Sequence, residues 1–294
     1  MTFLPRAKVL TIEEMQQISA AFVELGVRKI RLTGGEPLVR KGIVQLARHL
    51  GEMDDLNELA MTTNGVLLKE FAKPLADAGV SRLNVSIDSL KPDQFKSMTR
   101  FGELDDVIGG IEAATKAGFK RIKLNAVILE GVNDDELVDL ARFALDRELD
   151  ISFIEEMPLG HIDSHQRNQT ATASRKLREQ LDCVFGLMPS SKTTGGPSRY
   201  WKPREYENLI GFISPMTENF CDSCNRVRLT TEGQLLLCLG NEHSADLKAL
   251  VRRYPGDSER LKQGILEAIS RKPERHYFDP NQTEIVRFMN ATGG

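Results

Sequence analysis

Residues 11–37 read TIEEMQQISAAFVELGVRKIRLTGGEP and contain one full period of the pattern that decides the fold. Thr11 and Glu14 have the spacing of a capping box, so a helix is expected to begin after Thr11, and Gly26 is expected to end it. The apolar and β-branched run VRKIRLT then predicts a strand, which ends at the glycine-rich TGGEP. A helix followed by a strand and a polar loop indicates one unit of an α/β fold.

The same alternation continues along the chain. Strands are expected at ELAMTT, RLNVSID, RIKLNAVI and ISFIEEM, and helical patterns such as ELDDVIGGIEAATKAG and DDELVDLARFALDRE separate them. Regular alternation of this kind predicts a parallel sheet or barrel. Ligands of such folds bind where the strands end, and these ends read TGGEP, TTNG, SIDS, NAV and EEMP.

The alternation stops after Gly160, so we expect a first domain at 1–160 and a smaller one at 161–294. A helix is predicted at TASRKLREQL, and VRLTTEGQLLLC predicts a hairpin that turns at Glu232 and Gly233. Cys183 stands among apolar residues at helical spacing and is therefore expected to be a buried core thiol.

Three of the four cysteines lie in CDSCNRVRLTTEGQLLLC, residues 221–238. Their spacing indicates a metal site rather than a disulfide framework. Three thiolates could hold an iron–sulfur cluster with one iron open to a substrate atom. Alternatively, His243 would complete a Cys3His zinc site. The spacing alone is compatible with both.

Arg226 and Arg228 alternate next to these cysteines and would share one face of a strand. Two guanidinium groups on one face repel each other unless an anion lies between them, and their geometry suits phosphate. The alternative is a pair of solvated surface arginines. Lys123 is a further cation, inside an otherwise apolar strand, and needs a partner. In TGGEP, two glycines allow a ligand close to the backbone, and the glutamate offers an anion for an ammonium group.

The composition sets limits on location and partners. With 39 basic and 42 acidic residues, the net charge of −3 provides no overall attraction to nucleic acid or to an anionic membrane. No window approaches the length of a membrane span, and the first residues carry no signal-peptide cleavage site. A cytoplasmic location without nucleic-acid or membrane partners is therefore expected.

Several motifs together resemble one family. KIRLTGGEP, MTTNG, LNVSID, IKLNAV, FIEEMPLG, FCDSCNRVRLTTEG and a terminal GG occur in the order seen in molybdenum cofactor biosynthesis protein A, the GTP 3′,8-cyclase family of the radical S-adenosylmethionine (SAM) superfamily. The resemblance implies a partial (β/α)6 TIM-like barrel with a smaller C-terminal iron–sulfur domain. It also implies a SAM-dependent radical lyase that converts GTP to (8S)-3′,8-cyclo-7,8-dihydroguanosine 5′-triphosphate, the first step of molybdenum cofactor biosynthesis.

The resemblance assigns roles to individual residues but identifies no catalytic side chain. An auxiliary [4Fe-4S] cluster, whose open iron would meet the guanine of GTP, is implied at Cys221, Cys224 and Cys238. GTP contacts are implied at Arg31, Thr62, Lys123, Arg226 and Arg228, SAM contacts at Gly35, Ser86 and Met157, and a C-terminal double glycine that enters the active site at Gly293 and Gly294. The implied partners are an electron donor such as flavodoxin or ferredoxin, a downstream cyclic pyranopterin monophosphate synthase, and a second copy in a homodimer.

One departure from the family concerns a second [4Fe-4S] cluster, the one that binds SAM. The family's C-x3-C-x2-C motif does not occur in these 294 residues, and MTFLPRAKVLT resembles the segment just past it. The first barrel strand and the ligands of the SAM-binding cluster are therefore expected to be absent, so these residues alone are expected to be inactive and to release no 5′-deoxyadenosine. Two alternatives are another radical SAM enzyme with an auxiliary cluster, such as a peptide-modifying one, and a non-catalytic nucleotide-binding module with a structural zinc.

Overall fold

A computed structural model describes residues 5–99, 102–157, 173–240 and 243–275. The chain divides into two compact units. The first unit comprises Met1–Thr62, Pro74–Ser81 and Cys221–Gly294, and the second comprises Thr63–Lys73 and Arg82–Phe220. Each unit therefore combines residues from both sides of residue 160, and the division into domains at that point stays a prediction.

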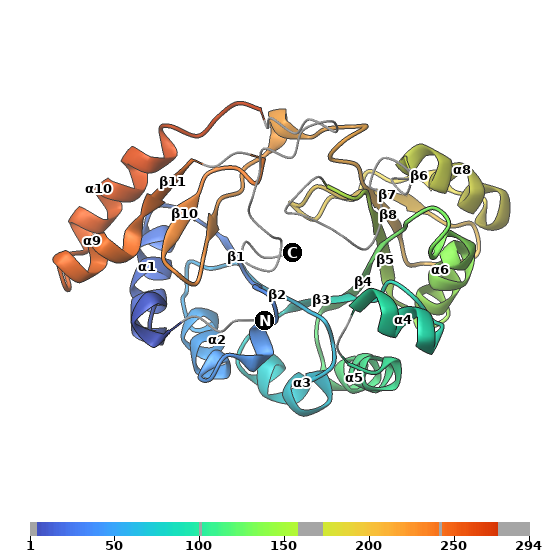
Figure 1. Cartoon of the computed structure of the whole chain (residues 1–294), viewed down its shortest axis with the longest axis horizontal. Helices are drawn as coiled ribbons and strands as arrows, with labels where there is room; N and C mark the ends of the chain where they lie inside the picture. Colours follow the sequence, from blue (N-terminus) through green and yellow to red (C-terminus); the bar gives the residue numbers. More distant parts are fainter. Residues whose placement is uncertain (1–4, 100–101, 158–172, 241–242, 276–294) are drawn as a thin grey trace. The chain divides into compact units, whose positions relative to one another are not determined.

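The first unit begins with the helix and strand expected from residues 11–37 (Figure 1). Helix α1 (Ile12–Glu24) starts with the capping box: the Thr11 hydroxyl accepts from Glu14 N at 3.2 Å, and the Glu14 carboxylate accepts from Thr11 N at 2.8 Å. Gly26, with φ +100°, follows the end of the helix, as expected. Strand β1 (Lys29–Leu32) then pairs in parallel with β2 (Glu58–Thr63), and both strands are confirmed.

The C-terminal part of the first unit forms a small antiparallel sheet. Strands β9 (Arg228–Leu229), β10 (Gln234–Leu236) and β11 (Ser244–Asp246) lie in the order β11-β10-β9. The hairpin between β9 and β10 is confirmed: Leu229 pairs with Leu235, and Gly233 has φ +82° in the turn.

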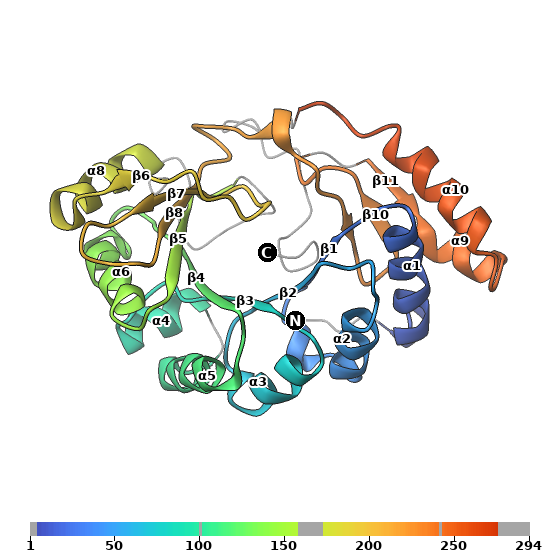
Figure 2. The same cartoon turned by 180° about the vertical axis from the view of Figure 1, so that it is seen from behind.

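One apolar core joins this sheet to the N-terminal helix. Helices α9 (Leu247–Arg253) and α10 (Ser258–Ile269) pack against α1, as both views show (Figure 1, Figure 2). The core contains Leu10, Ile18 and Phe22 from the start of the chain, and Leu235, Leu247, Val251, Leu261 and Ile265 from its end. The amide of Leu10 also donates to the carbonyl of Thr231 at 2.8 Å. The first unit is therefore closed by segments more than two hundred residues apart in the sequence.

The second unit contains the remaining predicted strands. Its strand order is β3-β4-β5-β8-β7-β6, and β3 (Arg82–Ser86), β4 (Arg121–Val127), β5 (Asp150–Ile154) and β8 (Ile210–Ile213) are parallel. The antiparallel strands β7 (Arg199–Lys202) and β6 (Met188–Pro189) extend this sheet. The parallel strand β8 was not predicted, because the short segment IGFI is reached through an antiparallel pair rather than through a helix.

The predicted helices of the second unit are present among the described residues. Helices α5 (Leu104–Ala117), α6 (Leu137–Leu145) and α8 (Ser174–Phe185) lie on the outer side of the strands of the second unit (Figure 2). The other elements are α2 (Ile43–Gly51), α3 (Leu68–Asp77), α4 (Pro92–Thr99) and the short helices η1 (Arg6–Lys8), η2 (Pro37–Val39), η3 (Asp134–Glu136) and η4 (Cys221–Ser223). Helix α5, with 14 residues, is the longest described, and none of the described helices is long and apolar enough to cross a membrane.

The expectation that Cys183 is buried was wrong, because the structure shows it exposed on α8. The buried face of α8 contains Leu177, Leu181 and Phe185. Consecutive residues of a helix are about 100° apart, so Cys183 lies roughly 200° from both Leu181 and Phe185, on the opposite side. Apolar neighbours in the sequence were therefore a poor guide to the environment of this thiol.

Candidate functional site

Two of the predicted GTP contacts meet at the ends of β1 and β2, in the first unit. The guanidinium of Arg31 donates to the hydroxyl of Thr62 at 3.1 Å, and Thr62 is buried. This hydrogen bond sets the direction of the guanidinium at the strand end, where ligands bind in parallel α/β folds. The structure thus brings Arg31 and Thr62 together as a preorganised pair.

The TGGEP loop follows Arg31 directly. Gly34 has φ +146°, a backbone conformation that favours glycine, and Gly35 is exposed. The carboxylate of Glu36 accepts from Leu38 N at 3.0 Å and caps η2. Glu36 therefore shapes the loop, a role that was not predicted, while the exposed backbone of Gly35 is accessible to a ligand.

The cysteines of the first unit are surrounded by cationic groups. Cys221, Cys224 and Cys238 are partly buried free thiols. Burial would raise the pKa of the Cys224 thiol, but the backbone N–H of Arg226 and the positive charges of Arg226 and Lys272 outweigh it and lower that pKa. The guanidinium of Arg226 lies 3.9 Å from the sulfur of Cys224. A lowered thiol pKa favours the thiolate, the form that binds metals.

The second arginine lies in the same electrostatic environment. Burial lowers the pKa of Arg228 to about 10, the charge of Arg226 lowers it too, and Cys224 and Cys238 act in the opposite direction. Only Arg228 lies in strand β9, so the expectation that both arginines alternate along one strand was wrong for Arg226. The two guanidinium groups are nevertheless close enough to repel each other, as expected for a site that receives an anion.

The metal-binding geometry of these cysteines is not that of a single bound ion. Among the described residues, no three His, Cys, Asp or Glu side chains lie close enough together to hold one metal ion. His243 is exposed. A four-iron cluster is larger than a single ion and separates its thiolates more widely, so this finding does not test it. The free thiols and the adjacent positive charges fit an anionic iron–sulfur cluster chemically.

Lys123, on β4 in the second unit, is 3% exposed and has polar and aromatic neighbours. Its ammonium donates to the hydroxyl of Ser152 at 3.1 Å and lies 5.9 Å from the ring centroid of Tyr200. Ser152 in turn lies 2.9 Å from the hydroxyl of Ser198. Lys123 was expected to need a partner, and these contacts provide one. Ser198 and Tyr200 come from the region after residue 160, so no local pattern could reveal them.

Asn125 is a candidate site residue that the sequence reasoning missed. It lies two residues after Lys123 on the same face of β4, and its register partners are Ser86 on β3 and Ser152 on β5. Its side-chain oxygen is buried and accepts no hydrogen bond from any described residue. Leaving a buried acceptor unsatisfied costs about 1–3 kcal/mol, which indicates a place for a donor group of a ligand. Asn125 is the polar residue of the strand end NAV, and this position at a strand end could have indicated it from the sequence.

Met157 is partly buried just past the end of β5, and Glu155 organises this segment. The buried carboxylate of Glu155 accepts from Ser174 N at 2.9 Å and from Met216 N and Thr217 N at 3.1 Å each. It also accepts from the hydroxyl of Thr217. Glu155 therefore connects the end of β5 to the start of α8 and to the turn at residues 216–217, and so fixes the backbone that leads to Met157.

Asp88 lies two residues after Ser86, at the same end of the sheet. Burial raises the pKa of Asp88 to about 6, and the backbone N–H of Val127, which donates to the carboxylate at 2.8 Å, acts in the opposite direction. The pKa of this carboxyl is thus raised above its unfolded value of 3.8, so the charged form destabilises the fold. The penalty is absent below about pH 4, grows as the pH rises through the folded pKa, and is complete above it.

Asp88→Asn is expected to remove this pH dependence, because the amide keeps an acceptor for Val127 N and carries no charge. The pKa shift corresponds to roughly 3 kcal/mol, so the variant should gain up to that free energy of unfolding at about pH 8 and nothing at about pH 4. Urea unfolding at a series of pH values measures the difference. Asp54→Asn, at an exposed aspartate, is the control. Equal pH profiles for the two variants would contradict this account of Asp88.

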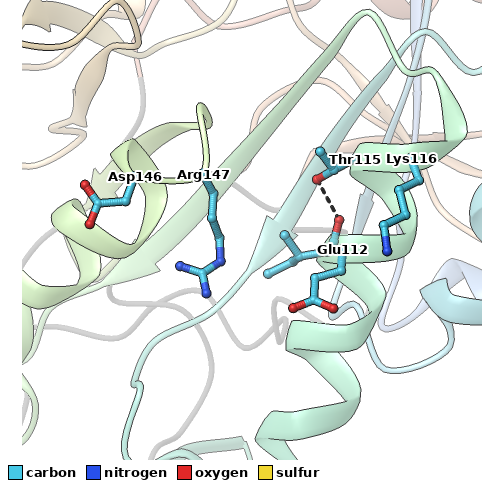
Figure 3. Close-up of a pocket in the computed structure, with 6 residues that line it drawn as sticks. Glu112, Thr115, Lys116, Asp146 and Arg147 are labelled. Atoms are coloured by element: carbon cyan, nitrogen blue, oxygen red, sulfur yellow. Dashed lines mark hydrogen bonds between the residues drawn. The ribbon is translucent and has the colours of Figure 1, made fainter.

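A surface depression between α5 and α6 lies elsewhere in the second unit (Figure 3). Its walls carry acidic and basic side chains in equal number, and the lining residues are Ile111, Glu112, Thr115, Lys116, Asp146 and Arg147. The Thr115 hydroxyl is already engaged, donating to the carbonyl of Ile111 at 2.9 Å. These helix segments lead into the beginnings of β4 and β5, whereas the predicted ligand contacts follow the strand ends. The depression therefore does not belong to the candidate site.

Comparison with known proteins identifies the family. Residues 2–144 match the Radical SAM superfamily, and residues 149–278 match Molybdenum Cofactor Synthesis C. A protein named GTP 3′,8-cyclase from Pseudomonas entomophila (strain L48) is 56% identical over 296 residues, and one from Saccharophagus degradans is 55% identical over 295. Each alignment covers 100% of this chain and 89% of the relative. The chain belongs to the GTP 3′,8-cyclase family.

Membership of the GTP 3′,8-cyclase family confirms the sequence resemblance and makes the chain a radical SAM enzyme of molybdenum cofactor biosynthesis, with SAM and a [4Fe-4S] cluster as cofactors. The predicted α/β radical SAM fold is confirmed as well. Streptococcus suis SuiB bound to S-adenosylmethionine has a TM-score of 0.60 over 95% of this chain and 70% of that chain, at 16% identity. At this identity the likeness concerns the fold alone.

The structure groups the candidate site residues in three places. Arg31 and Thr62 form one pair, Arg226 and Arg228 accompany the cysteines in the same unit, and Ser86 and Lys123 lie on neighbouring strands of the second unit. Gly293 and Gly294 lie outside the described residues.

Proposed function

We propose that this chain converts GTP to (8S)-3′,8-cyclo-7,8-dihydroguanosine 5′-triphosphate, using SAM as the source of the radical. The observation that carries this proposal is the 56% identity, over the whole chain, to a protein named GTP 3′,8-cyclase. The cationic environment of Arg226 and Arg228 supports a triphosphate substrate.

Binding of GTP to the reconstituted protein tests this function without requiring turnover. Under anaerobic conditions GTP, but not ATP or UTP, is expected to bind and to change the electron paramagnetic resonance spectrum of the reduced auxiliary cluster. Discrimination between guanine and adenine is required, because both nucleotides carry the same triphosphate. Equal binding of GTP and ATP, or a spectrum unchanged by GTP, would refute the proposal.

The substrate contacts follow from the side-chain chemistry. Arg226 and Arg228 bind the triphosphate through charge-assisted hydrogen bonds. Arg31, held by Thr62, and Lys123, held by Ser152, supply further donors for GTP. When bound, SAM and the iron–sulfur cluster supply the one-electron chemistry that begins the reaction. The protein orients the two ligands and excludes water.

The SAM contacts come from three strand ends. Gly35 provides exposed backbone after β1, Ser86 provides a hydroxyl at the end of β3, and Met157 provides an apolar surface after β5. The ligands of the SAM-binding cluster are not assigned here, because the one closely spaced cysteine triplet of the 294 residues is given to the auxiliary cluster. The proposed conversion requires ligands for that cluster, so the prediction that these 294 residues alone release no 5′-deoxyadenosine stands beside the proposed function of the protein.

The auxiliary cluster is proposed to be a [4Fe-4S] cluster on Cys221, Cys224 and Cys238, with His243 not involved. His243→Ala is therefore expected to retain the same iron and sulfide per chain as the wild type after anaerobic reconstitution. The matched substitution Cys224→Ala is expected to lose this cluster. Elemental analysis and visible absorption measure both variants. Stoichiometric zinc without iron, or loss of iron in His243→Ala, would support the Cys3His alternative.

The remaining partners follow from the proposed reaction. Reductive cleavage of SAM requires an electron, so a flavodoxin or ferredoxin is the proposed donor. The cyclised nucleotide would pass to a cyclic pyranopterin monophosphate synthase, and a homodimer is the proposed assembly. A cytoplasmic location is proposed because closely spaced free thiols suit a reducing compartment. Gly293 and Gly294 are proposed to enter the active site.

A further inference from the structure

Lys272 connects the two chain segments that carry the cysteines of the first unit. Its ammonium donates to the carbonyl of Arg226 at 3.0 Å and to the carbonyl of Leu237 at 2.7 Å. Arg226 is two residues after Cys224, and Leu237 directly precedes Cys238. One side chain from just beyond α10 therefore holds both arms of the hairpin next to their thiols.

Lys272 makes these contacts at the end of the hairpin where the strand pairing has stopped. The paired residues of β9 and β10 end at Arg228 and Leu236, so Arg226 and Leu237 lie beyond the ladder. An ammonium group has three donors and no acceptor, and two of these donors replace the missing strand-to-strand bonds. Lys272 thus closes the open end of the hairpin at the position of the thiols.

The charge of Lys272 acts at the same place. Together with the charge of Arg226, the charge of Lys272 lowers the pKa of the Cys224 thiol. Each electron added to an iron–sulfur cluster makes it more negative, so a nearby cation stabilises the reduced state more than the oxidised state. An uncharged residue that only bridged the two carbonyls would not have this effect.

We propose that Lys272 is a positioning residue for the auxiliary cluster, which keeps the two cysteine-bearing arms together and raises the reduction potential of the cluster. This inference rests on the proposed function, because it requires the cluster on Cys221, Cys224 and Cys238.

The test compares three reconstituted variants with the wild type. Lys272→Met removes the charge and the donors, Lys272→Arg keeps both, and Lys262→Met is the control. Lys262 also lies on this part of the chain, in α10, but its ammonium pairs with Glu24 at 3.0 Å and Glu259 at 2.6 Å. Iron release to a chelator measures how firmly the cluster is held. A redox titration followed by electron paramagnetic resonance measures its midpoint potential.

Lys272→Met is expected to release iron several times faster than the wild type and to have a more negative midpoint potential. Lys272→Arg should restore both properties, and Lys262→Met should match the wild type. If Lys272→Met does not fold, Lys272→Gln, which keeps a donor but no charge, should still show the more negative potential. If the wild type holds the cluster and the Met or Gln variant has the same iron release and midpoint potential as the wild type, the inference about Lys272 is overturned, while the proposed auxiliary cluster is not. A wild type that holds no cluster would overturn the proposed auxiliary cluster together with it.

Discussion

Replacing Arg226 and Arg228 together by alanine lowers the affinity for GTP by roughly two to four decades. Each guanidinium makes charge-assisted hydrogen bonds worth roughly 1.5–3 kcal/mol, which is one to two decades of affinity per arginine. Anaerobic calorimetry on the reconstituted protein measures the change. The control is the double replacement of Arg253 and Arg271, two exposed arginines of the same unit, which changes the net charge equally. Equal affinities in the two double variants would contradict a role of Arg226 and Arg228 in binding GTP.

Arg228 is expected to strengthen GTP binding but to lower the stability of the apoprotein. Burial lowers its pKa to about 10, so Arg228 stays charged at neutral pH, and the resulting cost of roughly 3 kcal/mol is lost only as the pH rises above about 10. Arg228→Met should therefore raise the free energy of unfolding of the apoprotein at pH 7 while it weakens GTP binding. If Arg228→Met instead lowered both the free energy of unfolding and the affinity for GTP, Arg228 would stabilise the fold through its packing.

The second large effect concerns Glu155. Glu155→Ala is expected to reduce the free energy of unfolding by roughly 3–5 kcal/mol, because it leaves the amides of Ser174, Met216 and Thr217 without their acceptor. Urea unfolding at neutral pH measures the loss. Glu155→Gln, which keeps one acceptor oxygen, should lose about half as much.

The control for Glu155 is Glu179→Ala, at an exposed residue of α8 that pairs with Arg175 at 2.8 Å. An exposed helix pair contributes at most about 0.5 kcal/mol, so this variant should stay close to the wild type. A loss in Glu155→Ala as small as in the control would show that water replaces the carboxylate without penalty. In that case Glu155 would not be what fixes the segment before Met157.

Features encoded within a few residues were predicted correctly. The capping box at Thr11 and Glu14, the five predicted strands and the turn at Gly233 depend on neighbouring residues, and the structure has all of them. The strand ends also indicated where polar side chains gather, since parallel strands end at one edge of a sheet.

Features that depend on distant residues were missed. The partners of Lys123 include Ser152, 29 residues later, and the acceptor role of Glu155 depends on Thr217, 62 residues later. The contacts of Lys123 and Glu155 exist only after the chain has folded, so neither periodicity nor spacing encodes them. Cys183 is a different case, because the helical spacing of Leu177, Leu181 and Phe185 already places this thiol on the opposite face of α8.

The closure of the first unit by the two ends of the sequence has a consequence during synthesis. Helix α1 leaves the ribosome early, but the residues that cover its apolar face, such as Leu235, Leu247 and Ile265, are made more than two hundred residues later. At 5–20 residues per second, this delay lasts roughly 10 to 40 s. The second unit, whose main segment is continuous from residue 82 to residue 220, is complete before that time. The nascent chain therefore lacks the part of the core that covers Ile18 and Phe22 until these last residues are made, and a chaperone that bound this helix would protect it during that time.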